Sequence, residues 1–201
     1  MFGRFRFLNP FPLVDGDLEL VPPSLAYVDA LLAMLRHPLT EQHEPEMAAL
    51  SRGQIVDFIN LAPNGRQPPD LLLGWVPSYQ FWMLWHDGTA GPRVAGTVTL
   101  RVGNSADIVR HLGHVGYHVY PPARGHRFAA RATRLILPLA RQHAIDPLWI
   151  TCNPDNLASR RTIERTGGQF VETVALPPDH LLRQRGETEK CRYRIDLRDT
   201  I

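Results

Sequence analysis

The sequence predicts an α+β fold in a three-layer α/β arrangement, with a mixed, mostly antiparallel central sheet of about seven strands flanked by helices. One observation is a hairpin, because the strand-like runs "YQFWMLWHD" (79–87) and "RVAGTVTLRVG" (93–103) are joined by the turn "DGTAGP". The other is the order strand, helix, strand, helix and further strands after residue 113. This order predicts one parallel strand pair near the middle of the sheet.

The N-terminal half supplies a first strand and two helices. "DLELVPPS" alternates apolar and polar residues before two prolines stop the strand, and Ser24 is a plausible N-cap for a helix with apolar spacing to Leu35. "SRGQIVDFINLA" (51–62) has the spacing of a second helix. The Pro- and Gly-rich segment 63–78 is expected to form a loop.

The C-terminal half begins with a third strand, "HVGYHVYPP" (114–122), and a long amphipathic helix over 126–143. The predicted buried face of this helix carries Phe128, Leu135, Ile136, Leu139 and Ala140. A short strand (147–154), a helix ending near Gly167, and strands at 169–177 and 190–197 complete the chain.

Composition favours one globular domain spanning residues 1–201. Hydrophobic residues make up 44% and charged residues 21% of the chain, and the net charge of +2 argues against a general nucleic-acid binder. The two cysteines, Cys152 and Cys191, have no disulfide-framework or zinc spacing. No segment has the pattern of a signal peptide or membrane span, so we expect a cytoplasmic protein without a membrane partner.

The turn "ARGHRFA" (123–129) connects the third strand to the long helix. A helix N-terminus presents free N–H groups and a positive dipole end, so this turn is a candidate anion site. It matches neither the Walker loop nor the G-x-G-x-x-G fingerprint. An ordinary exposed basic turn is the alternative.

Several segments in one order make the pattern more specific. "GHVGYHVYP", the turn "ARGHRFA", a helix, "LWITCN" and "NPDNLASRRTIERTGGQF" together resemble the GCN5-related N-acetyltransferase (GNAT) superfamily. The resemblance covers roughly residues 70–197 and is strongest to an uncharacterised bacterial branch of predicted acetyltransferases. It implies the GNAT acyl-CoA N-acyltransferase fold, acetyl-CoA as co-substrate, an acceptor-side part over 17–110 and an acetyl-CoA-binding core over 111–197.

The family's R/Q-x-x-G-x-G/A turn and its N-x-x-[AS] helix start carry over to named positions here. The resemblance implies that the backbone N–H of Val119 stabilises the oxyanion. The middle glycine of the family turn is Arg127 in this chain, and Ile163 occupies the place where many relatives carry a tyrosine acid. The implied acetyl-CoA-binding residues are Tyr117, Val119, Arg124, Gly125, His126, Arg127, Phe128, Ala129, Asn156 and Ser159.

Acetyl transfer to an amine needs a base for the amine and an acid for the leaving thiolate. His114 is the candidate base, with His118 on the same strand face as a weaker alternative. Ser159 and Tyr193 are the candidate acids. Expected acceptor contacts are Trp75, Tyr79 and His118; acidic residues 41, 44 and 46 could bind a cationic acceptor or form a solvated loop. No metal site is predicted.

These features predict an N-acetyltransferase that moves the acetyl group of acetyl-CoA directly to a primary amine of a small molecule such as an amino acid, a metabolite or an antibiotic. Two alternatives stay open: an enzyme that acetylates protein N-termini, as in relatives that modify ribosomal proteins, and a CoA-binding regulatory or immunity module with reduced catalysis. A homodimer is an expectation from the family.

Overall fold

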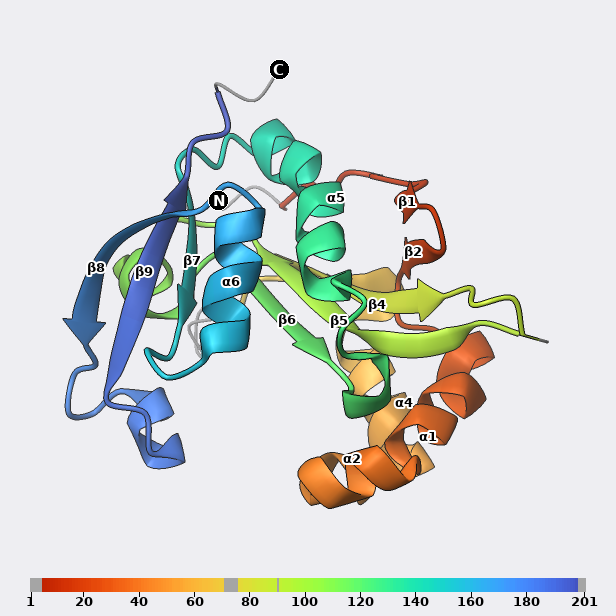
Figure 1. Ribbon diagram of the computed structural model, residues 1–201. Coiled ribbons are helices and arrows are strands. Elements are labelled where there is room, and N and C mark those ends of the chain that lie inside the picture. Colours follow the sequence, from red (N-terminus) through yellow and green to blue (C-terminus); the bar gives the residue numbers. More distant parts are fainter. Residues whose placement is uncertain (1–4, 71–75, 90, 199–201) are drawn as a thin grey trace.

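The computed structural model describes residues 5–70, 76–89 and 91–198, which form two hydrogen-bonded sheets with helices packed on them (Figure 1). The first sheet has the order β1 (Val14–Asp15), β2 (Leu18–Val21), β4 (Ser78–Trp85), β5 (Arg93–Arg101) and β6 (Val115–Val119), with short β3 (Arg66–Gln67) pairing β4. The second has the order β7 (Leu148–Cys152), β9 (Glu189–Ile195) and β8 (Gln169–Ala175). The predicted hairpin is β4–β5, and every pairing among the described strands is antiparallel.

The predicted parallel pair is wrong, because β6 and β7 do not form a ladder. They meet just before β6, where the His114 N–H donates to the Trp149 carbonyl at 2.7 Å, and Figure 1 shows the strands diverging from there. Gly113 permits this contact. Its φ is +69°, and a Cβ on it would lie 2.9 Å from the Thr151 nitrogen. The divergence opens the sheet between β6 and β7.

Helices cover both faces of the first sheet. α1 (Val28–Leu35) and α5 (Phe128–Gln142) both pack on β5 from opposite sides, with α4 (Arg52–Leu61) beside α1 and α6 (Leu157–Arg165) beside α5 (Figure 1). Ser51 and Gln54 form a reciprocal capping box that starts α4. Two short helices, α2 (Pro38–His43) and α3 (Pro45–Ala48), were not predicted, since each is too short to show a periodic pattern.

The core lies between the sheet and these helices. Four of the five residues predicted on the buried face of α5 are at most 2% exposed, and Leu135 is partly buried against the core. On β4, both alternating side-chain sets are buried, since one faces α5 and the other faces the N-terminal helices. Among the helices of the described residues, none combines the length and apolar composition that a membrane crossing requires.

Candidate active site

A cleft of about 560 Å³ lies between the end of β6, the following turn and α6. It therefore occupies the place where the sheet opens. Its lining brings together most of the predicted cofactor-binding residues, with several neighbours from α6: Tyr117, His118, Val119, Ala123, Arg124, Gly125, Arg127, Phe128, Ala129, Asn156, Ala158, Ser159, Arg161, Thr162 and Arg165.

The turn at the cleft floor presents backbone rather than side chains. Gly125 has φ +93° and open space around its Cβ position, and Arg127 has φ +59° as the residue before α5. No side-chain hydrogen bond caps the start of α5, so its first N–H groups are left for a ligand. Arg127 thus adopts the left-handed backbone conformation that favours glycine. The turn therefore keeps this backbone conformation although arginine stands at the family's glycine position.

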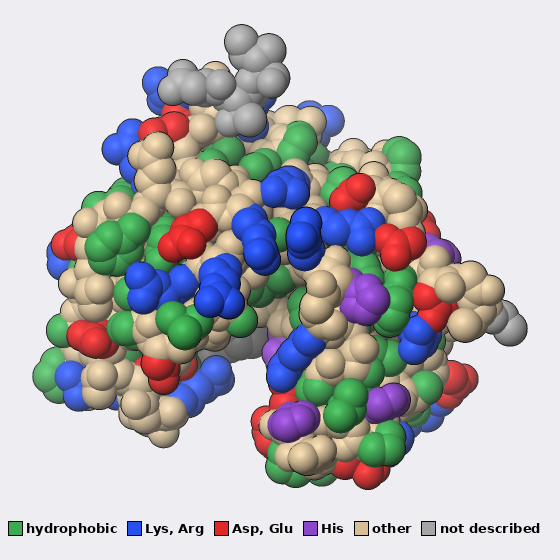
Figure 2. All heavy atoms as spheres, in the orientation of Figure 1, with side chains coloured by type: hydrophobic (Ala, Val, Ile, Leu, Met, Phe, Trp, Pro, Cys, Tyr) green, Lys and Arg blue, Asp and Glu red, His purple; other side chains and the backbone are tan. Residues whose placement is uncertain are grey.

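Basic side chains surround this turn. Arg127, Arg161 and Arg165 line the cleft, and Figure 2 shows Lys and Arg side chains gathered over α5 and α6 above a notch in this face. Arg124 differs from them. Its guanidinium ion-pairs with Glu44, and its Nε donates to the Val119 carbonyl at 3.1 Å. The cleft can hold an anion through the helix start and these three arginines.

Register determines which way the β6 amides point. The Arg101 N–H donates to the His114 carbonyl and the Tyr120 N–H donates to the Ala95 carbonyl, at 2.7 and 2.9 Å. In an antiparallel ladder, hydrogen-bonded pairs alternate with non-hydrogen-bonded pairs, so the N–H groups of Tyr117 and Val119 face away from β5. They face the gap toward β7. Both are therefore available to a group bound between the two strands.

The start of α6 meets β6 across the cleft. Asn156 caps α6 by accepting the Ser159 N–H at 3.0 Å, and Tyr117 Oη lies 2.8 Å from Ser159 Oγ. Burial raises the pKa of Tyr117 to about 12, so its hydroxyl keeps its proton at neutral pH. A protonated hydroxyl pair at this position can donate a proton to an anion formed in the cleft.

A second cavity of about 370 Å³ adjoins the first and shares Tyr117, Asn156 and Ser159 with it. Its other walls come from the π-helical turn Ile108–Leu112, the end of β7 and the 3-10 turn Leu181–Arg185. Neither helical turn was predicted. Its polar lining includes Arg101, His111, Thr151, Asn153, Arg185, Glu187 and Lys190.

His114 is not placed to be the base, which corrects the sequence-based expectation. It is fully buried, its Nδ1 accepts the Trp149 N–H at 2.9 Å, and its Nε2 lies 3.0 Å from Asn104 Oδ1. Because Nδ1 accepts, the proton of the neutral ring is on Nε2 and no lone pair is free. Burial lowers the pKa of His114 to about 4. Its contacts hold the junction of β6 and β7 instead.

The predicted roles of two tyrosines, Tyr79 as an acceptor contact and Tyr193 as an acid, also do not fit the structure. Tyr79 lies within β4 at 1% exposure, and its hydroxyl binds the Leu8 N–H and the His143 ring, so it belongs to the core under α5. Tyr193 is fully buried on β9, accepts from Arg160 Nε at 3.0 Å and lines neither cavity. Both aromatic side chains therefore stabilise the fold.

The remaining predicted contacts are placed as follows. The His126 ring packs on Trp85 with centroids 4.5 Å apart, away from the cleft lining. His118 lines the cleft, and its Nε2 lies 2.9 Å from Glu44. Trp75 lies outside the described residues. Glu44 is 9% exposed between His118 and Arg124, so its alternative as a solvated loop residue is wrong.

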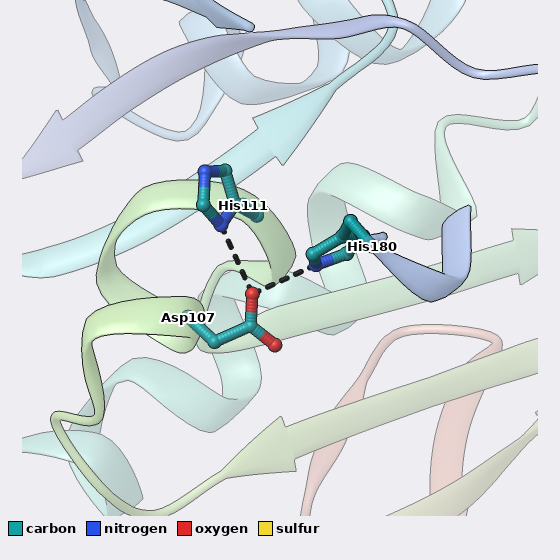
Figure 3. Close-up of side chains that lie close together, drawn as sticks. All are labelled: Asp107, His111 and His180. Atoms are coloured by element: carbon teal, nitrogen blue, oxygen red, sulfur yellow. Dashed lines mark hydrogen bonds and ion pairs between the residues drawn. The ribbon is translucent and has the colours of Figure 1, made fainter. Parts of the chain in front are cut away.

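Asp107, His111 and His180 form a cluster whose possible ligand atoms lie within 4.8 Å of one another (Figure 3). Asp107 Oδ1 is 3.0 Å from His111 Nδ1 and 2.8 Å from His180 Nε2. His180 Nδ1 accepts the Leu182 N–H, so the neutral ring carries its proton on Nε2, where a metal would have to bind. The cluster therefore fits shared hydrogen bonds better than a metal centre.

A family profile described as acetyltransferase (GNAT) domain matches residues 17–169, which is more than half of the chain. The chain belongs to the GNAT acetyltransferase family. A comparison with curated protein sequences found no match.

Solved GNAT structures share this fold. A microcin C7 self-immunity acetyltransferase, MccE, in complex with acetyl-CoA and AMP superposes with a TM-score of 0.62 at 16% identity, covering 90% of this chain and 93% of that one. The ribosomal L7/L12 alpha-N-protein acetyltransferase RimL in complex with coenzyme A gives 0.61 at 15%, covering 91% and 96%. A GNAT-family acetyltransferase from Bacillus anthracis gives 0.63 at 13%, covering 92% and 98%. At these identities the likeness shows the fold alone.

This chain's departures from the GNAT pattern have structural counterparts. Ile163 is fully buried, so the position where many GNAT relatives carry a tyrosine acid contributes to the core here. The tyrosine hydroxyl that faces Ser159 comes from β6 instead, as Tyr117. Sequence reasoning assigned Tyr117 to cofactor binding alone and missed His111, Asp107 and Arg101, since no local motif marks residues that only the fold brings to one cavity.

Proposed function

We propose that this GNAT protein transfers the acetyl group of acetyl-CoA to a primary amine of a small molecule. The observation that carries the proposal is the junction of the two cavities at Tyr117 and Ser159. The first cavity contains the helix start and the arginines that suit a pyrophosphate, and the second has a polar lining. An acetyl group at the shared wall would face an amine in the second cavity.

The cleft fits acetyl-CoA on three grounds. The uncapped α5 start and the open Gly125 backbone suit phosphate oxygens. The three cleft arginines supply the opposing charge. The outward N–H groups of Tyr117 and Val119 can pair with the pantetheine arm and polarise the thioester carbonyl, as an oxyanion site requires.

Two histidines are candidates to take the proton from the amine. His118 is bound to Glu44 through Nε2 and lines only the first cavity. His111 lines the second cavity, and its Nδ1 faces Asp107 while Figure 3 shows the other ring nitrogen pointing away from that carboxylate. With the proton on Nδ1, Nε2 has a free lone pair. We therefore assign the base to His111, positioned by Asp107.

On the leaving side, Ser159 Oγ is placed to donate to the thiolate and Tyr117 Oη to replenish that proton. Tyr117, whose pKa is raised, gives its proton to Ser159 and regains one from solvent, so neither hydroxyl stays deprotonated after the reaction. The Tyr117 hydroxyl also lies 3.3 Å from the Ser159 carbonyl, so the pair is already positioned and the reaction requires little reorganisation.

Calorimetric titration with acetyl-CoA, followed by a screen of small amines and short peptides for CoA release, tests this proposal. We expect saturable binding and turnover of a small amine. Absence of binding at millimolar acetyl-CoA would refute it. Turnover of peptide N-termini alone would support a protein acetyltransferase, and binding without any turnover would support a regulatory CoA-binding module.

A further inference from the structure

The second cavity carries an excess of positive charge on the acceptor side. Three basic residues line it, Arg101, Arg185 and Lys190, and the one lining carboxylate, Glu187, is ion-paired with Lys190. Lys190 also donates to Asn153 Oδ1 at 2.7 Å. The two arginines therefore have no carboxylate partner within the lining.

Arg101 is the more constrained of the two. It extends from the end of β5 across Gly116 of β6, where a Cβ would lie 3.3 Å from its guanidinium. Nη1 donates to the carbonyls of Gly113 and Leu112 at 3.1 and 3.5 Å. Among the described residues, no carboxylate lies within ion-pair distance of Arg101. Its planar fork thus retains donors for another group.

A charge held this way is costly unless a partner compensates it. Burial lowers the pKa of Arg101, and the negative charge of Asp107 partly opposes this effect. Asp107 is itself hydrogen-bonded to two histidines. Carbonyl dipoles stabilise a guanidinium less than an anion does. An anionic group bound beside Arg101 would compensate this charge further.

The Asp107 cluster also positions Arg185. His180 binds Asp107 directly before the 3-10 turn Leu181–Arg185, and its Nδ1 accepts the Leu182 N–H at 3.1 Å (Figure 3). The turn that carries Arg185 is thereby attached to the helical turn that carries His111. Arg185 and His111 both line this cavity.

A further cavity adjoins the second one at Arg101. A third cavity of about 460 Å³ shares Arg101 and Leu112 with the second, and Gln80 lines it. The Gln80 Oε1 is buried without a hydrogen-bond partner among the described residues. An unpaired buried acceptor of this kind fits a donor group on a bound molecule.

We propose that the acceptor amine carries an anionic group, a carboxylate or a phosphate, that binds Arg101 and Arg185 beside the transferred acetyl group. This inference rests on the proposed acetyl transfer and specifies its substrate class. The amine lies between this anion and the thioester, within reach of His111. Bidentate recognition by Arg101 provides affinity and orients the amine.

Matched amines test the inference. Butylamine, 4-aminobutyrate and 3-aminopropyl phosphate differ chiefly in the anionic group, and glycylglycine can be compared with glycylglycinamide. We expect higher kcat/KM for the anionic member of each set, mainly through KM. The phosphate and carboxylate arms identify which anion is preferred. Equal values for neutral and anionic amines would overturn the inference.

Variants connect the preference to the residues. Arg101→Gln should reduce kcat/KM for anionic amines about 10- to 150-fold, as expected for one charged hydrogen bond, and leave neutral amines nearly unchanged. Arg185→Gln, on an exposed turn, should do the same to a smaller extent and cannot disturb the core. Arg52→Gln, on the distant α4 surface, is the matched control. Equal losses for neutral and anionic amines in both cavity variants would overturn the inference.

Binding separates this inference from the proposed function. Calorimetric titration of 4-aminobutyrate and butylamine into the protein saturated with CoA should show tighter binding of the carboxylate, even in a protein that turns over slowly. A protein that binds no acetyl-CoA fails the proposed function. A protein that binds and uses acetyl-CoA but shows no preference for the carboxylate in turnover or binding fails only this inference.

Discussion

At the scale of single residues, the most consequential contact is the hydroxyl pair between β6 and α6. Tyr117 Oη and Ser159 Oγ lie 2.8 Å apart at the wall that both cavities share. Ile163, at the position where many relatives carry a tyrosine, is buried in the core. In the proposed reaction, the proton that Ser159 gives to the leaving thiolate is therefore replaced from a strand residue, Tyr117.

Ser159→Ala and Tyr117→Phe should each lower kcat by about 10²- to 10⁴-fold while acetyl-CoA affinity changes little, since the hydroxyls act when charge develops on sulfur. Single-turnover kinetics and calorimetry measure the two effects. Tyr193→Phe is the control, because Tyr193 lines neither cavity. Full kcat in both cavity variants would exclude this proton route.

His111→Gln should lower kcat by at least about 10²-fold and alter the acidic limb of the pH–rate profile, because it removes the proposed base. Asp107→Asn should have a smaller effect of the same kind by disturbing the ring's proton position. His118→Gln is the comparison. A large loss confined to His118→Gln would transfer the role of base to that residue.

Arg127 combines backbone strain with a charge. Arg127→Gly should leave the free energy of unfolding unchanged or raise it by up to about 1 kcal/mol, since glycine adopts a positive φ freely but loses more chain entropy. Acetyl-CoA affinity should fall about tenfold through the lost guanidinium. Arg127→Ala loses the same charge and keeps the strain, so it should unfold more easily than Arg127→Gly. The opposite order would exclude strain at this turn.

At the scale of elements, the separation of β6 from β7 creates the site. β6 ends at the turn that lines the cleft, and the N–H groups of Tyr117 and Val119 face the space between the two strands. The position of α6 completes that space, because Asn156 caps the helix and its first turn carries Ser159. A change at this helix start should therefore affect stability and binding together.

Asn156→Ala should destabilise the protein by about 1 kcal/mol, because the Ser159 N–H loses its capping partner, and should raise the acetyl-CoA KM. Urea denaturation and steady-state kinetics measure both. Asn156→Asp, which keeps a capping oxygen, should restore stability. Equal stability of the alanine variant and the wild type would show that the cap contributes nothing here.

At the scale of the whole molecule, His114 makes stability depend on pH. Its pKa is lowered to about 4 by burial, with a smaller effect from nearby Arg101, whereas an unfolded histidine has a pKa of about 6.5. The unfolded chain therefore binds the proton first as pH falls. Stability is complete above about pH 6.5 and decreases toward pH 4, by on the order of 3 kcal/mol from this residue.

Denaturant unfolding of wild type and His114→Gln at pH 7.5, 6 and 5 measures this effect. The wild type should lose more stability than the variant over this range, although the variant starts lower because its packing and hydrogen bonds are altered. Parallel pH dependences in the two proteins would show that His114 does not titrate on unfolding.

Many residues that line the cleft could be named in advance from the resemblance to the GNAT family. The anion turn, Val119, Asn156 and Ser159 follow one another in a recognisable order, and the structure brings them to one cleft. The predicted catalytic roles of His114 and Tyr193 do not fit the structure, because both side chains are buried. Burial and hydrogen-bond partners decide whether a polar side chain can react, and residue spacing in the sequence shows neither. Glu44 was undervalued for the same reason, since its two partners are distant in sequence.

By itself the sequence determined the α+β class, the hairpin, the long amphipathic helix and the glycine-containing turn before it, because each depends on periodicity or turn chemistry within a few residues. Only the tertiary structure decided that β6 and β7 separate after a single backbone contact, and that Arg101, His111 and Arg185 share one cavity with Tyr117. Those arrangements arise from packing between segments far apart in the chain. Such contacts are selected by the free energy of the whole fold, so no local stretch of residues encodes them.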